Sequence, residues 1–220
     1  MEMRKTNTSF ALGYNSYKMF WVFLVCSFIG YAFETIYAVI RFSHLESHAG
    51  VIYGPFSEIY GFSAVIMVLL LHRVHSMSIY NLFFGCAIIG AVFEFICSLF
   101  QQTVFGYVSW DYSLERFNIF GRTGFFYGLI WGVLGVFLIK FLYPLISRHL
   151  EKLPNKYGLA ITWLLILFMV FDLSISAAAT YRANQRFNHI PATNDLQVQL
   201  DKYYPDTYIK KIYPNIIYGK

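Results

Sequence analysis

Charged residues are scarce in this 220-residue chain. They make up 13% of the sequence, whereas hydrophobic residues make up 57% and aromatic residues 20%. About a quarter of the residues of a soluble domain are charged, so this chain has too few polar groups to cover a soluble surface. Its apolar residues also lie in long continuous runs, which is typical of an integral membrane protein.

Other absences exclude several functions. Cys26, Cys86 and Cys97 all lie inside apolar runs, and their spacing fits neither a disulfide framework nor a metal site. No Walker A sequence occurs, so the chain does not hydrolyse nucleotide by that route. The formal charge is +5, but the basic residues cluster at the ends of apolar runs and do not indicate nucleic-acid binding. We expect no cofactor and no metal.

Five apolar runs are candidate membrane-spanning helices. A helix needs roughly 20 apolar residues to cross a hydrocarbon core of about 30 Å, and these runs lack the alternation of a barrel strand. They cover residues 19–40, 55–71, 79–100, 123–143 and 157–180, of which 55–71 is the shortest. The sequence therefore predicts an all-α integral membrane protein, with a helical bundle over residues 1–180 and a polar, tyrosine-containing tail over 181–220.

Basic residues near the membrane predict the orientation of the chain. On the N-terminal side they are Arg4, Lys5, Lys18, Arg73, Lys140, Arg148, Lys152 and Lys156, and on the other side Arg41, Arg116, Arg122, Arg182 and Arg186. The side richer in Lys and Arg faces the cytoplasm by the positive-inside rule. We therefore expect a multi-pass protein of the cell membrane with a cytoplasmic N-terminus and an external tail.

Two shared patterns predict an internal repeat. Residues 30–36 and 90–96 both read G-x-x-F-E-x-I, and residues 54–61 and 121–128 both read G-x-x-x-x-x-Y-G. Each unit would be a helix with an intramembrane Glu, a loop, and a helix that opens with Tyr-Gly. Such units would be parallel repeats of a helix pair, followed by a fifth helix. Chance similarity between apolar segments is the alternative explanation.

The repeat places acidic and tyrosine side chains at one depth. Glu34 and Glu94 lie six residues before the ends of their predicted spans, and Asp172 lies eight residues from the end of the last span. Tyr60 and Tyr127 lie about one turn inside the helices that return from that side. An ionisable residue inside a span is a functional candidate. The alternative is that hydrogen bonds to each Glu lock the bundle.

Loop residues flank this polar layer. They are Glu58, Asp111 and Arg122, and Arg122 stands at the start of a predicted span. Its guanidinium fork suits a carboxylate or phosphate partner. The alternative is that Arg122 pairs with Asp111 or Glu94 and so holds the loop over the bundle.

The remaining polar segments carry weaker signals. Residues 44–48 read HLESH, but they lack the helical H-E-x-x-H spacing of a zinc site. His72 and His75 flank Arg73 and are interpreted as interface residues. In the tail, Asn194 is predicted to cap a short helix through Asp201, with Leu196 and Leu200 on one face. A tail that folds back over the polar layer is a further hypothesis.

Motifs along nearly the whole chain resemble one known family. They are FETIY at 33–37, GPF at 54–56, IYG at 59–61, FE at 93–94, WDYS at 110–113, FN at 117–118, GR at 121–122 and WG at 131–132, with PATN at 191–194, YPD at 204–206 and YPN at 213–215 in the tail. With these motifs the chain is similar to the bacterial CmpB-like permeases, labelled ABC-transporter type IV. The resemblance implies a bacterial cytoplasmic-membrane protein that transports a substrate.

The leading hypothesis is a transporter or ABC-type permease subunit with an acidic intramembrane site. Its substrate or ion site would contain Glu34, Glu94 and Arg122, supported by Asp111, Tyr60, Tyr127 and Asp172. In this hypothesis the glutamates bind a cation or a proton, and Arg122 balances or recruits an anion.

Two other function classes stay open. One is a membrane enzyme acting on a lipid or isoprenoid substrate, with a Glu as general acid or base and Arg122 on a head-group phosphate. The other is a noncatalytic scaffold or sensor that uses its tail as the contact surface. Besides the lipid bilayer, a separate ATPase subunit and a second copy of the chain are the partners considered. The predicted cytoplasmic loops at 72–78 and 144–156 offer an ATPase little docking surface.

Overall fold

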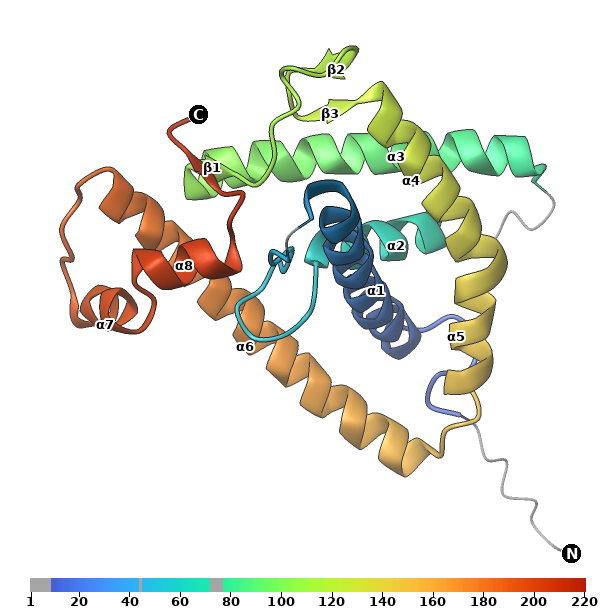
Figure 1. Ribbon diagram of the computed structural model, residues 1–220. Helices are drawn as coiled ribbons and strands as arrows, with labels where there is room; N and C mark the ends of the chain where they lie inside the picture. Colours follow the sequence, from blue (N-terminus) through green and yellow to red (C-terminus); the bar gives the residue numbers. More distant parts are fainter. Residues whose placement is uncertain (1–8, 44, 72–76) are drawn as a thin grey trace, which may run out of the picture.

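The computed structural model describes residues 9–43, 45–71 and 77–220, which fold mainly into helices (Figure 1). His44, His72, Arg73 and His75, discussed above, lie outside the described residues. The strands within the described ranges are two residues long: β1 (Tyr107–Val108), β2 (Asn118–Ile119), β3 (Thr123–Gly124) and β4 (Ile217–Tyr218). The helical membrane fold expected from the sequence is confirmed.

Four helical segments are long and apolar enough to cross a membrane. They are α1 (Ser16–Phe42), α3 (Ile79–Phe100) continued by the π-helix η1 (Gln101–Phe105), α4 (Phe125–Phe137) continued by the π-helix η2 (Leu138–Leu142) and α5 (Tyr143–Leu150), and α6 (Asn155–Phe187). Helical structure extends beyond the apolar runs at several ends. Residues 181–187, predicted to begin the tail, still belong to α6.

The fifth predicted span corresponds to α2 (Glu58–Leu71), which is shorter than a full crossing. Its 14 residues span roughly 21 Å, against a hydrocarbon core of about 30 Å. Residues 55–57 stay outside the helix, and the N–H of Ser57 donates to the main-chain oxygen of Ser27, in the middle of α1, at 3.0 Å. The chain thus descends along α1 before α2 begins, and we call residues 50–57 the re-entrant segment.

Small residues bring the helices of each pair together. A Cβ at Gly61 of α2 would lie 2.1 Å from Oγ of Ser27 in α1. Gly128 of α4 holds the matching position in the predicted repeat, and its Cβ would lie 3.9 Å from the main-chain oxygen of Ala87. Ser27 and Ala87 also occupy matching positions, three residues before the G-x-x-F-E-x-I pattern. The repeat itself stays a prediction.

α6 runs apart from the α1–α4 bundle over much of its length (Figure 1). An apolar groove of about 300 Å³, lined in part by Phe20, Phe62 and Met169, separates it from α1 and α2. Near its start, α6 accepts a 2.8 Å hydrogen bond at Oγ1 of Thr162 from Nε1 of Trp21. The residues that line this groove are all apolar.

The tail folds back toward the bundle. α7 (Asp195–Tyr203) is capped by the side chain of Asn194, as predicted, and α8 (Asp206–Ile212) follows. β4 then pairs antiparallel with β1, which lies just after η1. Of the two leucines predicted on one face of α7, Leu200 is buried and Leu196 is exposed. We call the side formed by residues 43–57, 106–124 and 188–220 the tail face.

Two arginines of α6 hold the tail in place. Arg182, only 3% exposed, donates to both carboxylate oxygens of Asp201 at 2.9 and 2.8 Å. Arg186 donates to the same carboxylate and to the main-chain oxygen of Tyr204. The hydroxyl of Tyr204 lies 2.7 Å from that of Tyr53 in the re-entrant segment. The tail is therefore tied both to α6 and to the loop between α1 and α2.

A buried ion pair lies at the opposite face. Lys18 of α1 is 1% exposed, donates to Oγ of Ser147 at 2.7 Å, and pairs with Glu151 just beyond α5. Lys18 is also one of the basic residues from which the orientation is predicted.

Candidate functional site

The first carboxyl of the predicted layer, Glu34, lies on α1 and is held by α2. The hydroxyl of Tyr60 donates to its Oε1 at 2.9 Å. Gly30, one turn earlier, leaves space for the Tyr60 ring, because a Cβ there would lie 2.3 Å from Cγ of Tyr60. On its other side, Oε2 of Glu34 lies 3.7 Å from Nδ1 of His48, and a third of the Glu34 side chain is exposed.

The second carboxyl, Glu94, lies on α3 and is 5% exposed. Its Oε2 accepts a 2.6 Å hydrogen bond from Thr123, and its Oε1 accepts one of 3.1 Å from the hydroxyl of Tyr112. Tyr127 stacks on Tyr112 with ring centroids 3.8 Å apart. The repeat would place Tyr127 on Glu94 as Tyr60 lies on Glu34, but Tyr112 of the longer second loop takes that role, and Tyr127 supports Tyr112.

The two helix pairs meet between these carboxyls. The ring of Tyr60 lies 5.2 Å from the ring of Trp131 in α4. Trp131 in turn covers Gly90, where a Cβ would lie 2.3 Å from its Cγ. Tyr60 and Trp131 thus connect the helix pair that carries Glu34 to the pair that carries Glu94. That the two glutamates form one site stays a prediction.

The re-entrant segment joins the first helix pair to α6. The N–H of Tyr53 donates to Oδ1 of Asp172 at 2.9 Å, and that of Ile52 donates to Oγ of Ser176 at 2.8 Å. From the tail, the hydroxyl of Tyr213 donates to the main-chain oxygen of Gly50 at 3.3 Å. Irregular backbone is tolerated at membrane depth only where protein surrounds it or where it lines a cavity. The segment meets this condition through α6 and the tail.

Sequence reasoning missed the central position of Glu58. The sequence predicts it in a flanking loop, whereas it is the first residue of α2. Its carboxylate lies against the re-entrant segment, because a Cβ on Gly50 would lie 1.5 Å from its Oε2. Its carboxylate interacts electrostatically with those of Asp172 and Glu34. A Ser-Glu pair at the start of an apolar run is a helix N-terminal signal, and it could have identified this position.

Buried carboxylate oxygens in this layer have no partner among the described residues. They are Oε2 of Glu58 and Oδ2 of Asp172, and Asp172 is completely buried. None of the ion pairs in the described ranges includes Glu58, Asp172 or Glu94, and the basic side chain beside Glu34 is His48. A charged residue at the centre of a membrane costs about 2.5 to 3.5 kcal/mol on insertion scales. Carboxyls without a counter-ion there are expected to hold protons or a cation.

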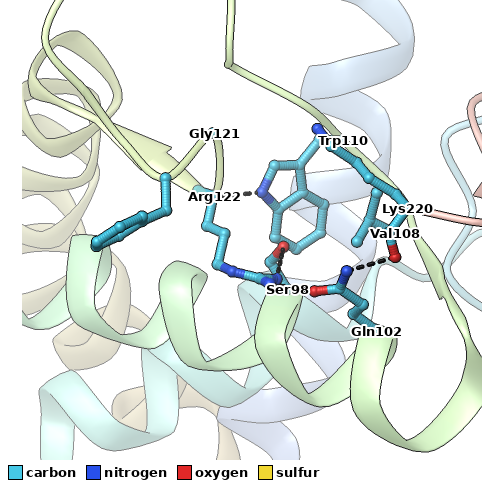
Figure 2. A pocket seen from close by; sticks show the side chains of 8 residues that line it. Ser98, Gln102, Val108, Trp110, Gly121, Arg122 and Lys220 are labelled. Carbon is cyan, nitrogen blue, oxygen red and sulfur yellow. Dashed lines mark hydrogen bonds between the residues drawn. The ribbon is translucent and has the colours of Figure 1, made fainter.

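Arg122 and Asp111, predicted in the same site, belong to a separate cluster. Arg122 donates to Oγ of Ser98 at 3.2 Å and to Oε1 of Gln102 (Figure 2). Asp111 pairs instead with Lys220 of the tail, and this pairing, together with hydrogen bonds from Ser113, lowers its pKa to about 2. Within the described part of the chain, no hydrogen bond or ion pair joins Arg122 or Asp111 to the four carboxyls.

The long apolar helices indicate a multi-pass helical membrane protein, and the family match that follows makes it one of transporter type. A family model described as "Putative ABC-transporter type IV" matches residues 21–177, and the chain belongs to this family. The match extends from α1 into α6 and includes all four carboxyls of the layer. Comparison with curated proteins and with solved structures found no match.

Proposed function

We propose that this protein is a transporter-type membrane subunit whose buried acidic layer binds and releases protons. The layer consists of Glu34, Glu58, Glu94 and Asp172. The observation that carries the proposal is that two buried carboxylate oxygens of this layer, on Glu58 and Asp172, have no hydrogen-bond partner in the described ranges. A proton shared between neighbouring carboxyls satisfies such oxygens and removes the cost of buried charge.

Access from outside the protein supports a role in exchange rather than in packing alone. A third of the Glu34 side chain is exposed, whereas Glu94 and Asp172 are buried. Glu34 therefore lies at the edge of the layer, beside His48, and the other carboxyls lie inside it. Transporter sites typically combine irregular backbone with polar groups near the middle of the membrane. The re-entrant segment provides that backbone beside Asp172.

Infrared spectroscopy of the purified protein in liposomes tests this proposal without knowledge of the substrate. The carbonyl band of protonated carboxyl groups should change in intensity as pH is varied, and Glu34→Gln and Glu94→Gln should each remove part of that change. Glu115→Gln is the matched control, because Glu115 is exposed on the 106–124 loop. All variants should keep the unfolding temperature of the natural protein.

Two outcomes would contradict the proposal. A carbonyl band that does not respond to pH means that the layer exchanges no protons. Loss of folding in both glutamine variants means that the glutamates lock the bundle, which is the structural alternative. A response that appears only on addition of Na⁺ or K⁺ would replace the proton with a cation as the bound species.

The membrane-enzyme alternative is less well supported. It requires Arg122 and a catalytic glutamate to face one substrate, yet the hollow beside Arg122 is lined by no carboxylate side chain. A permease subunit of the ABC type further requires a separate ATPase, because this chain has no Walker A sequence. Mass spectrometry of the protein purified from native membranes in mild detergent tests for that partner. If no ATPase copurifies, the proposal is restricted to a transporter that works without ATP hydrolysis.

A further inference from the structure

A small hollow opens beside Arg122 at the tail-face end of α3. Its volume is about 30 Å³, and its polar lining comes from Ser98, Gln102, Trp110, Arg122 and Lys220. Figure 2 shows the Arg122 side chain directed toward Ser98 and Gln102, with the indole of Trp110 alongside. Nε1 of Trp110 donates to the main-chain oxygen of Arg122 at 2.7 Å and so fixes the backbone from which the guanidinium extends.

The guanidinium of Arg122 lacks an acidic partner in the described part of the chain. Its side-chain acceptors, Ser98 and Gln102, are both neutral. The closest acidic candidate from the sequence, Asp111, is occupied by Lys220, and Glu94 accepts from Thr123 and Tyr112. A guanidinium has five N–H donors in a planar fork, and two of them are used by these contacts. The main-chain oxygen of Lys220 accepts from Nε2 of Gln102 at the same hollow but not from Arg122 (Figure 2). The donors left over on Arg122 favour an anion.

The hollow limits what that anion can be. A volume of about 30 Å³ exceeds the roughly 10–15 Å³ that a single water requires, but it admits only a small group. Ser98 belongs to the last turn and a half of α3, and Arg122 lies three residues before α4. Ser98 and Gln102 thus lie within about two turns of the end of the third span (Ile79–Phe105), and Arg122 lies just before the fourth (Phe125–Leu150). Lipid head groups are expected near these span ends. A phosphate group fits the fork geometry of Arg.

Apolar side chains continue from the hollow into the bilayer. Arg122 lies over the ring of Phe95 at 5.9 Å, and Phe95 contacts the ring of Phe120 edge-on at 6.3 Å. Phe120 is 85% exposed, and Phe125 at the start of α4 is 58% exposed. The chain turns at Phe120 and Gly121 with positive φ of 53° and 68°, which directs Phe120 outward. An anion that also carries an apolar chain would contact both surfaces.

From this geometry we infer that the Arg122 hollow binds the phosphate group of an anionic membrane lipid, whose acyl chains lie along Phe95, Phe120 and Phe125. The inference does not depend on the proton-binding layer, because the hollow has its own residues. It assigns to Arg122 a role in lipid binding that is independent of transport chemistry.

Lipid binding to the full-length protein in detergent tests the inference. The probe is phosphatidylglycerol, and the measurements are native mass spectrometry and the rise in unfolding temperature on addition of lipid. Arg122→Gln should weaken binding by about tenfold or more, since a charge-assisted hydrogen bond contributes about 1.5–3 kcal/mol. Arg116→Gln is the matched control: Arg116 stacks on Phe117 in the same loop and does not line the hollow, and its loss should leave binding unchanged.

A second variant covers the case in which Arg122→Gln does not fold. Gln102→Glu places a carboxylate beside the guanidinium, so Arg122 gains an internal partner and phosphatidylglycerol should be displaced. The variant also loses the hydrogen bond that Gln102 donates to the main-chain oxygen of Lys220, so its unfolding temperature without lipid is measured as well. Unchanged lipid binding by either variant would overturn the inference.

Two further probes test whether the phosphate group is needed for binding and whether it must belong to a lipid. Diacylglycerol, which has the same chains without phosphate, should bind equally to the natural protein and to Arg122→Gln. Inorganic phosphate should bind far more weakly than phosphatidylglycerol at equal concentration. Equal binding of inorganic phosphate would mean that the hollow receives a free anion, which contradicts the lipid assignment. An Arg122-dependent effect on diacylglycerol would contradict the role of the phosphate.

Discussion

The rings of Tyr60 and Trp131 lie 5.2 Å apart, and each ring also covers a glycine on the helix that precedes its own in its pair. This contact joins the first helix pair, α1 and α2, to the second, α3 and α4, at the level of the acidic layer. The distance between Glu34 and Glu94 therefore depends on how closely the two glycines allow these rings to approach.

Substitution of either glycine should loosen this junction. A Cβ at Gly30 or Gly90 would lie 2.3 Å from the ring that covers it, and we expect Gly30→Ala and Gly90→Ala each to lower the free energy of unfolding by about 1–3 kcal/mol. Denaturant unfolding in detergent measures the effect. Gly85→Ala is the control, because its Cβ would make an ordinary 3.7 Å contact with Leu71. Equal losses at all three positions would show that the ring contacts are not the cause.

Removal of the Tyr60 hydroxyl tests its hydrogen bond to Glu34 directly. Tyr60→Phe keeps the ring against Trp131 and removes the 2.9 Å bond to Oε1 of Glu34. The expected loss of stability is about 1 kcal/mol, typical of one hydrogen bond. Tyr157→Phe serves as the reference, because Tyr157 is 65% exposed at the start of α6. An infrared spectrum identical to that of the natural protein would argue against coupling between Tyr60 and the glutamate.

The ion pair at the opposite face should stabilise the fold. Glu151→Gln leaves the buried ammonium of Lys18 without its counter-ion, and because Glu151 is itself about a third exposed, the expected loss of stability is about 1–3 kcal/mol. The pKa of Glu151 is lowered, chiefly by Lys18, so its contribution is present above the ordinary Glu pKa and is lost as pH falls through the lowered value. Unfolding measured against pH should show this acid limb in the natural protein only. Lys152→Gln, next to it and exposed, should behave like the natural protein.

Docking of the tail should weaken in acid. Arg182, followed by Arg186, lowers the pKa of Asp201, so the clamp is complete above the ordinary Asp pKa of about 4 and is lost as pH falls through the lowered value. Hydrogen exchange in α7 and α8, corrected for intrinsic rates, should accelerate over that range. Asp201→Asn should produce the same acceleration at neutral pH, whereas Asp195→Asn, on the exposed side of α7, should not. Slow exchange in Asp201→Asn would mean that β4 and Tyr204 hold the tail without the clamp.

Much of the bundle could be predicted because the bilayer imposes simple rules on the sequence. Apolar runs identified the long spans, and the constant helical rise predicted Glu34, Tyr60 and Glu94 at one depth. The ends of the helices were less predictable. α6 continues to Phe187 because Arg182 and Arg186 are paired with the tail, and such long-range partners leave no local pattern.

The sequence also did not predict the re-entrant segment or the separation of Arg122 and Asp111 from the acidic layer. Descent of residues 50–57 along α1 depends on bonds to Ser27, Asp172 and Ser176, and no periodicity in those residues encodes it. Glu58 was consequently placed in a loop. Asp111 and Arg122 are close in sequence and opposite in charge, yet Lys220, more than a hundred residues away, takes the carboxylate.

The order of synthesis gives the folded-back tail a consequence for assembly. Tyr204 and Tyr213, which contact the re-entrant segment, leave the ribosome after every spanning helix has been made. Until then, the re-entrant segment lacks both of these contacts. We therefore expect its final packing to follow the synthesis of residues 204–213.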